Sequence, residues 1–330
     1  MASGDGATPL DVLGIGNAIV DVLSPTDDAT IARHELPKGT MTLIDADRAD
    51  ALYGQMGPAV EVSGGSCANT VAGIASLGGR SAYIGRVRDD ELGRIFTHDI
   101  RAAGVQYDTP PAGDGPGTAR CLIMVTPDAQ RTMSTYLGAS VELGPEDVDP
   151  ALVASADVTY LEGYLWDPPR AKEAFRIAIA AAHAAGRRVS FTLSDPFCVE
   201  RHRDEFRALV DGEVDVLFAN QHEIEALYEA SDLDAAVAAV RGRCEIAVIT
   251  RSEHGSLVVT AEEVHEVPAA PVERVIDTTG AGDLFAAGFL FGLTRGRPLG
   301  ECAHIGGLAA AEVISHYGAR PEVRLAELLG

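Results

Sequence analysis

The residues with the clearest chemical potential form the segment 277–283, which reads Asp-Thr-Thr-Gly-Ala-Gly-Asp. Gly280, Ala281 and Gly282 lead into an apolar helical stretch, where the first N–H groups lack an intrahelical partner and the helix dipole is positive. Such a terminus suits a phosphoryl group in transfer. Asp283 in the first turn would stabilise a helix by about 0.3–1 kcal/mol, but that role does not require glycines on the same turn. We therefore predict an anion hole with Asp283 as the base that accepts a hydroxyl proton.

Two glycine clusters in the N-terminal third would let a ligand approach the backbone closely. Residues 14–17 read Gly-Ile-Gly-Asn, but Ile19 takes the place of the third glycine of the dinucleotide fingerprint, so a nicotinamide dehydrogenase is the weakest interpretation. Gly64 and Gly65 precede a helix of small residues that carries Asn69, and adjacent glycines there leave amides free to face a ligand. Both clusters also fit tight turns that serve packing alone.

Residues 220–223, Asn-Gln-His-Glu, open a helix after an apolar strand. Asn220 is a good N-cap and Glu223 completes a capping box, so a structural role accounts for the pattern. The functional alternative is that Glu223 orients Mg²⁺ through water, because hard cations seek carboxylates. The sequence holds no G-x-x-x-x-G-K-[ST] run, which excludes a P-loop ATPase.

Composition excludes several classes of protein. The chain has 330 residues, 46% of them hydrophobic, and a net charge of −23, which suits one large domain and disfavours nucleic-acid binding. No apolar run approaches the roughly 20 residues of a membrane helix, and the N-terminal stretch lacks the basic and apolar regions of a signal peptide. Five dispersed cysteines without a C-x-x-C pair indicate reduced thiols in a cytoplasmic protein.

Short apolar runs alternate with helical patterns along most of the chain, which predicts an α/β fold with a mostly parallel central sheet covered on both faces. We expect one domain over residues 1–330. Ligands of such sheets bind beyond the carboxyl ends of the strands. The expected strands are residues 11–16, 81–85, 158–163, 188–193, 214–219, 245–250 and 256–260.

Two segments do not follow this alternation of apolar strands and helices. Residues 37–45 and 117–137 show period-2 alternation without accompanying helices, and residues 126–130 read as a hairpin turn. Strands of this kind could form a separate small sheet over an active site. We therefore expect a β-sheet lid whose strands are inserted from about 24–60 and 106–140.

Taken together, these segments resemble the ribokinase family, the PfkB carbohydrate and nucleoside kinases. Residues 63–96 are similar to the first family signature, and residues 277–290 are similar to the second with almost no departure. Residues 220–223 match the N-x-x-E motif of the family. Residues 249–255 resemble the segment that meets ATP, and residues 314–323 resemble the stretch that closes the adenine pocket. The resemblance implies a ribokinase-like three-layer sandwich with a lid.

The resemblance also implies roles for individual residues. Asp283 would be the catalytic base, the backbone of Gly280, Ala281 and Gly282 would form the anion hole, and ATP and Mg²⁺ would be the cofactors. Contacts with the hydroxyls of the acceptor would come from Asn17, Asp21, Gly64, Gly65 and Asn69. Contacts with Mg²⁺-ATP would come from Asn220, Glu223, Thr250, Arg251, Gly255, Gly282 and Gly318, with Glu223 acting on the metal through water. Some members hold a monovalent cation such as K⁺, which would here lie near Asp277 and Thr279.

Within the family, residues 14–22, 160–168 and 194–200 are most similar to the adenosine-kinase branch. By that match, apolar side chains would enclose a purine: Leu137 with Tyr164 or Leu165, together with Met41 and Leu43 of the lid. Alternatively, these side chains only pack the core or the lid. The sequence departs from the pattern of the branch at Met41, Glu162 and Trp166.

We therefore predict an ATP-dependent kinase that phosphorylates the 5′-hydroxyl of a nucleoside, with adenosine as the favoured acceptor and AMP as the product. The alternatives are a sugar kinase of the same family, acting on fructose, ribose or a keto-deoxy sugar acid, and a non-catalytic nucleoside-binding protein on this fold. The intact Asp283 argues against the non-catalytic alternative. The expected partner is a small-molecule acceptor bound by a monomer or homodimer, with no nucleic acid and no membrane.

Overall fold

The computed structural model describes residues 9–128 and 130–330. Most of the N-terminal stretch in which we expect no signal peptide lies outside these residues, as does Ala129 of the predicted hairpin turn. Within the described residues, no helix combines the length and apolarity that a bilayer span requires.

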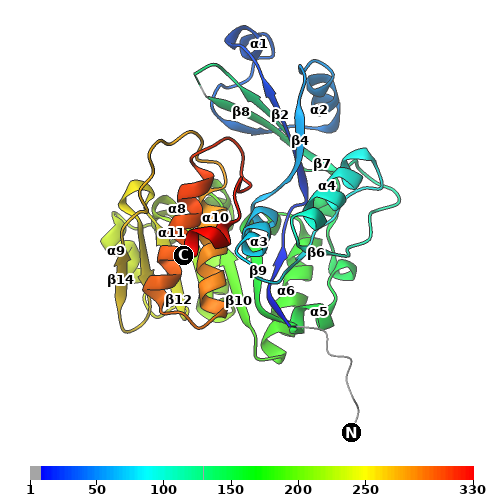
Figure 1. Cartoon of the computed structure of the whole chain (residues 1–330). Helices are drawn as coiled ribbons and strands as arrows, with labels where there is room; N and C mark the ends of the chain where they lie inside the picture. Colours follow the sequence, from blue (N-terminus) through cyan, green and yellow to red (C-terminus); the bar gives the residue numbers. More distant parts are fainter. Residues whose placement is uncertain (1–8, 129) are drawn as a thin grey trace.

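A large, mostly parallel sheet runs through the centre of the molecule (Figure 1). Its strand order is β14-β13-β12-β11-β10-β9-β1-β5-β6, and only the pairs that involve β13 are antiparallel. Every strand expected from an apolar run is present in it. The strands are β1 (Leu10–Ile15), β5 (Ser81–Ile84), β6 (Gln106–Tyr107), β9 (Ala156–Glu162), β10 (Arg188–Thr192), β11 (Val216–Asn220), β12 (Ile246–Thr250), β13 (Ser256–Val259) and β14 (Val264–Val267).

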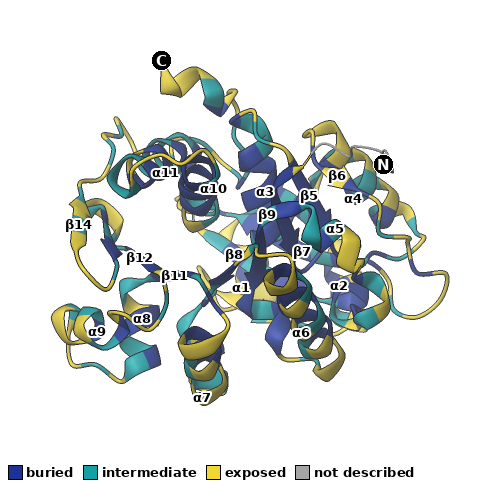
Figure 2. Cartoon of the chain, turned by 90° about the horizontal axis from the view of Figure 1, so that it is seen from below, coloured by how far each residue is buried: buried dark blue, intermediate teal, exposed yellow. Residues whose placement is uncertain are grey.

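Helices cover both faces of this sheet, because successive strand residues are buried on opposite sides. Val12 belongs to one hydrophobic cluster and Leu13 to the other. The first cluster includes residues of α3 (Ser66–Ser76), α4 (Glu91–Ala102), α10 (Ala281–Thr294) and α11 (Leu299–Val313). The second includes residues of α5 (Pro150–Ala154), α6 (Pro169–Ala184), α7 (Pro196–Gly212), α8 (Gln221–Tyr228) and α9 (Leu233–Val240). The buried strands lie between two helical layers (Figure 2). The predicted α/β three-layer arrangement is confirmed.

A smaller sheet lies beyond one end of the large one (Figure 1). Its order is β3-β8-β7-β2-β4, from β2 (Ile19–Pro25), β3 (Met41–Leu43), β4 (Val60–Gly64), β7 (Ala119–Val125) and β8 (Arg131–Tyr136). The helices α1 (Asp28–Arg33) and α2 (Ala46–Tyr53) belong to the same part of the chain. The hairpin closes where Thr126 N–H donates to the Gln130 carbonyl at 3.0 Å.

The boundaries of this lid differ from the expected ones. β2 begins at Ile19, directly after the first strand of the large sheet, and β4 ends at Gly64. Conversely, Gln106 and Tyr107 pair with β5 in the large sheet. The first lid segment, from Ile19 to Gly64, therefore begins and ends at the two glycine clusters noted in the sequence. Short 3₁₀ helices complete the chain: η1 (Gly138–Glu142), η2 (Pro145–Asp147), η3 (Gly163–Trp166), η4 (Ser252–His254) and η5 (Leu325–Leu329).

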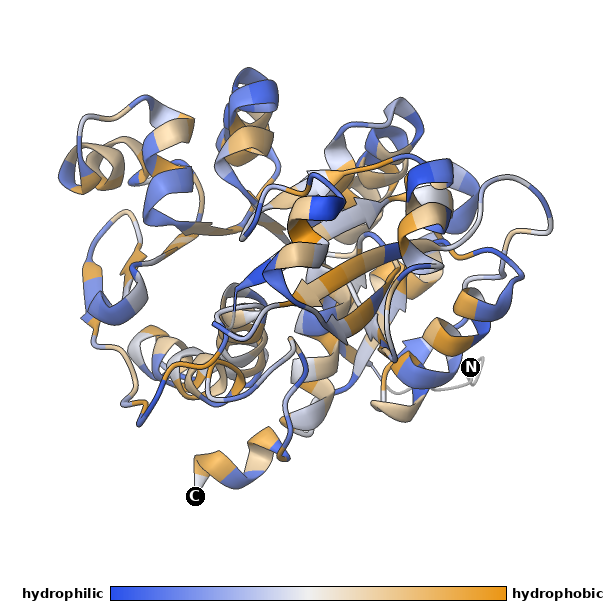
Figure 3. Ribbon diagram, turned by 90° about the horizontal axis from the view of Figure 1, so that it is seen from above, coloured by the Kyte–Doolittle hydropathy of each residue, from blue (hydrophilic) through white to orange (hydrophobic). Residues whose placement is uncertain are grey.

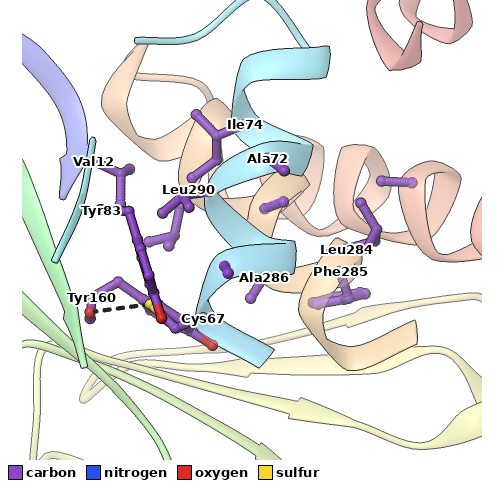
Figure 4. Close-up of a cluster of buried hydrophobic side chains, with 14 of the residues drawn as sticks. Val12, Cys67, Ala72, Ile74, Tyr83, Tyr160, Leu284, Phe285, Ala286 and Leu290 are labelled. Carbon is purple, nitrogen blue, oxygen red and sulfur yellow. Dashed lines mark hydrogen bonds between the residues drawn. The ribbon is translucent and has the colours of Figure 1, made fainter. Parts of the chain in front are cut away.

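Close helix packing sets the position of the 277–283 segment. A Cβ atom on Gly73 of α3 would lie only 2.7 Å from atoms of Ala287 and Leu284, so α3 and α10 approach at glycine distance. Gly288 makes the same kind of contact with Gly306 of α11. Figure 4 shows Leu284 and neighbouring α10 residues beside α3 in the apolar cluster. The surrounding helices carry hydrophobic and hydrophilic residues on different sides (Figure 3). Because α3 and α10 pack against each other at glycine distance, their N-terminal ends lie side by side.

Candidate active site

Asp283 lies in the first turn of α10 and is held by two donors from the start of α3. Ser66 Oγ–H donates to one carboxylate oxygen at 2.6 Å, and Asn69 Nδ2–H donates to the other at 2.9 Å. Burial raises the pKa of Asp283, and these two hydrogen bonds and the nearby Arg320 oppose the rise. A carboxylate with a raised pKa, aligned by two donors, is suited to accept a proton from a hydroxyl group.

The backbone before Asp283 adopts a conformation that requires glycine. Gly280 has φ of 78°, and a Cβ atom there would lie 2.8 Å from Ala319 Cβ. Gly282 is exposed, and a Cβ atom at this position would meet no atom within 4 Å. The Ala281 N–H donates to the Thr278 carbonyl at 3.2 Å, which closes the turn into the helix. The open side of the first helical turn is therefore at Gly282.

A cavity of about 750 Å³ opens at this helix terminus. This volume is suitable for a small cofactor or nucleotide. Of the residues predicted to bind ATP, Thr250, Gly255 and Gly282 line it. The cavity also has apolar walls, which the sequence did not single out: Pro268, Ala269, Ala270, Val272, Val275, Phe285 and Ile314. Its extent from Thr250 to Gly282 would bring a bound triphosphate towards the start of α10.

Asn220, Glu223, Arg251 and Gly318, which were also predicted to contact Mg²⁺-ATP, do not line the cavity. The guanidinium of Arg251 donates to the His254 carbonyl at 2.7 Å and pairs with Glu266 at the same distance. Gly318 N–H donates to Asp277 Oδ2 at 2.9 Å, and Ala319 packs against Gly280. The C-terminal stretch therefore supports the 277–283 loop as well as closing the cavity through Ile314.

Asn220 and Glu223 form the capping box at the start of α8. Asn220 N–H and Nδ2–H donate to the two Glu223 carboxylate oxygens at 2.8 and 2.6 Å, and Glu223 N–H donates to Asn220 Oδ1 at 2.9 Å. Burial is the main cause that raises the pKa of Glu223 to about 7, and Asp195 adds to the rise. Within the part of the chain that the structure describes, no three His, Cys, Asp or Glu side chains are grouped to hold a metal. A single buried carboxylate that acts through water is compatible with Mg²⁺, which is held mostly by phosphates and waters.

On the acceptor side of Asp283, the Asp21 carboxylate lies against the glycine pair Gly64 and Gly65. A Cβ atom on Gly64 would collide with the Asp21 carboxylate, and one on Gly65 would collide with the Asn17 carbonyl. Gly65 also has φ of 96°, which favours glycine. Burial raises the pKa of Asp21 to about 7, with a further contribution from Asp283. The structure thus brings together the acceptor-side residues from β2, β4 and α3 beside Asp283.

Arg320 supplies positive charge beneath this acidic site, and sequence reasoning missed it. Its guanidinium donates to the Ser63 carbonyl at 3.1 Å and to the Ala68 carbonyl at 2.7 Å. Its charge opposes the rise in the pKa of both Asp21 and Asp283. Burial lowers the pKa of Arg320 itself. In the sequence, Arg320 is marked only by its place in a C-terminal loop of small residues. Its contact with Ser63 could not be foreseen, because the two residues lie far apart along the chain.

The predicted monovalent-cation site is occupied by a side chain of the lid. Arg131 of β8 places Nη2 2.5 Å from Asp277 Oδ2, and the side chains are only 8% and 5% exposed. Thr279 donates through its N–H and Oγ–H to Asp277 Oδ1 at 3.1 and 2.8 Å. Because a guanidinium already neutralises Asp277, these residues do not fit K⁺ bound at that carboxylate. Arg131 was not anticipated, because its contact exists only when the lid lies over the 277–283 loop.

Asn17 has both polar groups of its side chain hydrogen-bonded within the protein. It is only 1% exposed. Its Nδ2–H donates to Glu162 Oε1 at 2.7 Å, and its Oδ1 accepts a hydrogen bond from Ser140 Oγ at 2.9 Å. Asn17 therefore supports the site through its backbone contact with Gly65.

The predicted purine-binding side chains have different degrees of exposure. Leu165 is fully buried in the core among the second cluster, whereas Tyr164 and Leu137 keep partly exposed surface. Tyr164 is fixed by two contacts with Ser194, which its N–H and its hydroxyl make at 3.0 and 3.1 Å. Met41 of β3 is 45% exposed in the lid. Of Tyr164 and Leu165, the two alternatives predicted to lie opposite Leu137, Tyr164 is the one with surface available to a ligand.

Similarity to known proteins shows the family of this chain. Residues 40–324 match the pfkB family carbohydrate kinase model. The chain belongs to this family. A solved adenosine kinase from Sinorhizobium meliloti is 57% identical over 98% of this chain and 99% of that one, with a TM-score of 0.91. A probable sugar kinase from Rhizobium etli CFN 42 is 53% identical over 97% and 98% of the two chains, also with a TM-score of 0.91.

A more distant relative supports the same family. The adenosine kinase of Saccharomyces cerevisiae is 30% identical over 94% of this chain and 96% of its own. As a PfkB-family kinase, the protein is a phosphotransferase that acts on an alcohol group, and the family implies ATP as the phosphate donor. The same comparisons include both nucleoside and sugar kinases.

Proposed function

We propose that this kinase transfers the γ-phosphate of ATP to the 5′-hydroxyl of adenosine, with Asp283 as the base. The observation that carries the proposal is the position of Asp283. Its carboxylate is held by Ser66 and Asn69 at the helix terminus, between the cavity that Gly282 lines and the acceptor-side cluster around Asp21. An acceptor hydroxyl and a terminal phosphate would therefore meet beside one carboxylate.

In this mechanism the protein mainly positions the reactants and stabilises charge. Asp21, Asn69 and the Gly64–Gly65 pair would bind the ribose hydroxyls, and Asp283 would remove the proton of the attacking hydroxyl. The N–H groups of the first helical turn at Gly282 and Asp283 would face the transferring phosphoryl group, because Leu284 N–H already donates to the Gly280 carbonyl at 2.8 Å. Loose transition states of phosphoryl transfer need little more than such positioning and charge.

Mg²⁺ would supply charge neutralisation at the phosphates when it is bound. Glu223 is the residue proposed to orient it through water, together with Asn220, which fixes both carboxylate oxygens. No step of this mechanism depends on K⁺, because Arg131 already neutralises Asp277.

Adenosine is the favoured acceptor for two reasons. Tyr164 and Leu137 are partly exposed, and an aromatic and an aliphatic side chain at these positions suit a flat base more than a sugar acid. Two relatives that align over more than nine-tenths of the chain are named adenosine kinases. A sugar as acceptor is the second candidate, favoured by the relative from Rhizobium etli that is named a probable sugar kinase.

A coupled assay of ADP release would test the acceptor. The panel would contain adenosine, other nucleosides, ribose, fructose and a keto-deoxy sugar acid, each with Mg²⁺-ATP. We expect the highest kcat/KM with adenosine. Activity with a sugar and none with adenosine would overturn the acceptor and leave the family assignment unchanged.

A further inference from the structure

Glu162 is a buried carboxylate at the centre of the site for which the reaction itself provides no role. It is the last residue of β9, is only 1% exposed, and occupies a position where the sequence departs from the adenosine-kinase pattern. Glu162 Oε1 accepts hydrogen bonds from Asn17 Nδ2 at 2.7 Å and from Asn17 N at 3.4 Å. Its Oε2 accepts one from Cys67 N at 2.9 Å. All three partners are N–H donors.

These contacts join segments that lie far apart in the sequence. Asn17 belongs to the connection that enters the lid, and its carbonyl lies against Gly65. Its Oδ1 accepts from Ser140 in η1, whose Oγ also contacts the Leu137 carbonyl at 2.6 Å. Gly16 must lack a side chain, because a Cβ atom there would collide with Glu162 Oε2. The loop after β1 is therefore built around this carboxylate.

The contact with Cys67 links Glu162 to the base. Cys67 follows Ser66, and both lie in the first turn of α3, which also carries Asn69. Ser66 and Asn69 are the two donors to Asp283. A shift of the α3 terminus would therefore move both donors and change the alignment of the Asp283 carboxylate.

We propose that Glu162 is a positioning residue of the phosphoryl-transfer reaction, which holds the β1 exit loop and the start of α3 in one arrangement. It acts through Asn17 on the acceptor side and through the α3 terminus on Asp283. The inference rests on the role proposed for Asp283, but it does not depend on which hydroxyl compound is the acceptor.

The three N–H donors, and not the surrounding charges, explain why a carboxylate is needed here. The titratable groups that influence Glu162 or respond to it are all acids: Asp283, Cys67, Tyr83, Tyr164 and Cys198. Burial raises the pKa of Glu162 to about 7, while the Cys67 and Asn17 hydrogen bonds oppose the rise. An ionised carboxylate can accept from all three N–H groups. An amide cannot, since its NH₂ group must face at least one N–H donor.

The test compares Glu162→Gln with Glu162→Asp and with a matched buried carboxylate away from the site. Asp11 is that control: its Oδ2 accepts from Arg80 N at 2.7 Å and from Arg295 Nη2 at 3.2 Å, near the start of β1. Each variant would be assayed with the acceptor on which the wild type is most active. The measurements are kcat, the KM of the acceptor, the KM of ATP and the thermal unfolding midpoint.

We expect Glu162→Gln to lower kcat/KM for the acceptor on the order of 10- to 100-fold, because small misplacements of reacting groups have effects of this size. The KM of ATP should stay within about twofold of the wild type, because Glu162 does not line the nucleotide cavity. Asp11→Asn should change the unfolding midpoint without changing kcat/KM. Glu162→Asp keeps the charge but withdraws the carboxylate, and should lose activity to a smaller extent.

Either of two results would overturn the proposal. One is a folded Glu162→Gln variant with wild-type kcat and acceptor KM. The other is a Glu162→Gln variant in which the KM of ATP and the KM of the acceptor rise equally, in proportion to the loss of folded protein. If Glu162→Gln does not fold, the Glu162→Asp variant decides. Failure of adenosine as acceptor is seen separately in the wild-type enzyme, and failure of the base role is seen in Asp283→Asn.

Discussion

Replacement of Asp283 by asparagine is the most direct perturbation of the proposed chemistry. The side chain keeps its size, and the site can accommodate the amide. Asn69 Nδ2–H would donate to the amide oxygen, while the Ser66 hydroxyl, which now donates at 2.6 Å, can rotate to accept from the new NH₂ group. The fold and the nucleotide cavity should therefore survive the change.

The expected loss of activity follows from the role of the carboxylate. A positioned general base contributes typically 10²–10⁴-fold, so kcat should fall by roughly that factor. This corresponds to about 3–5 kcal/mol of transition-state stabilisation. The KM of ATP should change little, because Gly282 contributes only backbone to the cavity and the amide lacks a charge that could repel phosphate.

Steady-state kinetics by coupled ADP release, together with ATP titration by calorimetry, would separate these effects. Asn69→Asp is not a suitable control because it adds a charge, whereas Ser66→Ala removes one donor and leaves the base in place. That variant should lose less activity than Asp283→Asn. Near wild-type turnover in Asp283→Asn would refute the assignment of the base.

The remaining predictions concern the lid, the acceptor glycine and pH. Arg131→Met should lower the free energy of unfolding by about 3 kcal/mol, measured in urea, and reduce kcat, because it leaves the buried Asp277 carboxylate without its cation. Gly64→Ala should raise the acceptor KM at least about tenfold in steady-state assays, because the added methyl group displaces Asp21. The pKa values of Asp21 and Glu223 rise from 3.8 and 4.5 to about 7. Folded protein then binds more protons than unfolded protein in this window, so their contribution to stability should decline as pH rises from about 4 to 7 in thermal unfolding.

Each of these predictions has a control. Arg131→Lys keeps the positive charge and should lose less than Arg131→Met; equal losses would contradict the ion-pair argument. Gly113→Ala places a methyl group in open space and should leave the acceptor KM unchanged. For pH, the double variant Asp21→Asn with Glu223→Gln should show a flatter dependence of the unfolding midpoint, and an unchanged slope would count against the raised pKa values.

The large sheet could be predicted from sequence because its signals are local. Continuous apolar strands separated by helical patterns indicate a parallel sheet with two covered faces. The structure contains each of the expected strands and a hydrophobic cluster on each face of the sheet. The 277–283 segment is likewise local, since a helix start with small residues and an aspartate defines its own chemistry. The lid was foreseen from period-2 alternation, but its edges were not, because strand boundaries depend on pairing partners elsewhere in the chain.

The sequence by itself determined the candidate base, the helix terminus proposed to face the phosphoryl group and the general architecture, because each depends on residues close together in the chain. Only the tertiary structure decided which distant groups act on them. Arg320 balances the charge of Asp21 and Asp283, Arg131 takes the position expected for a cation, and Glu162 links the β1 exit to α3. Apart from Arg320 and Asp283, which are 37 residues apart, the interacting groups are separated by about ninety to three hundred residues. The strength of these interactions depends on burial and orientation that arise only when the helices and the lid pack together.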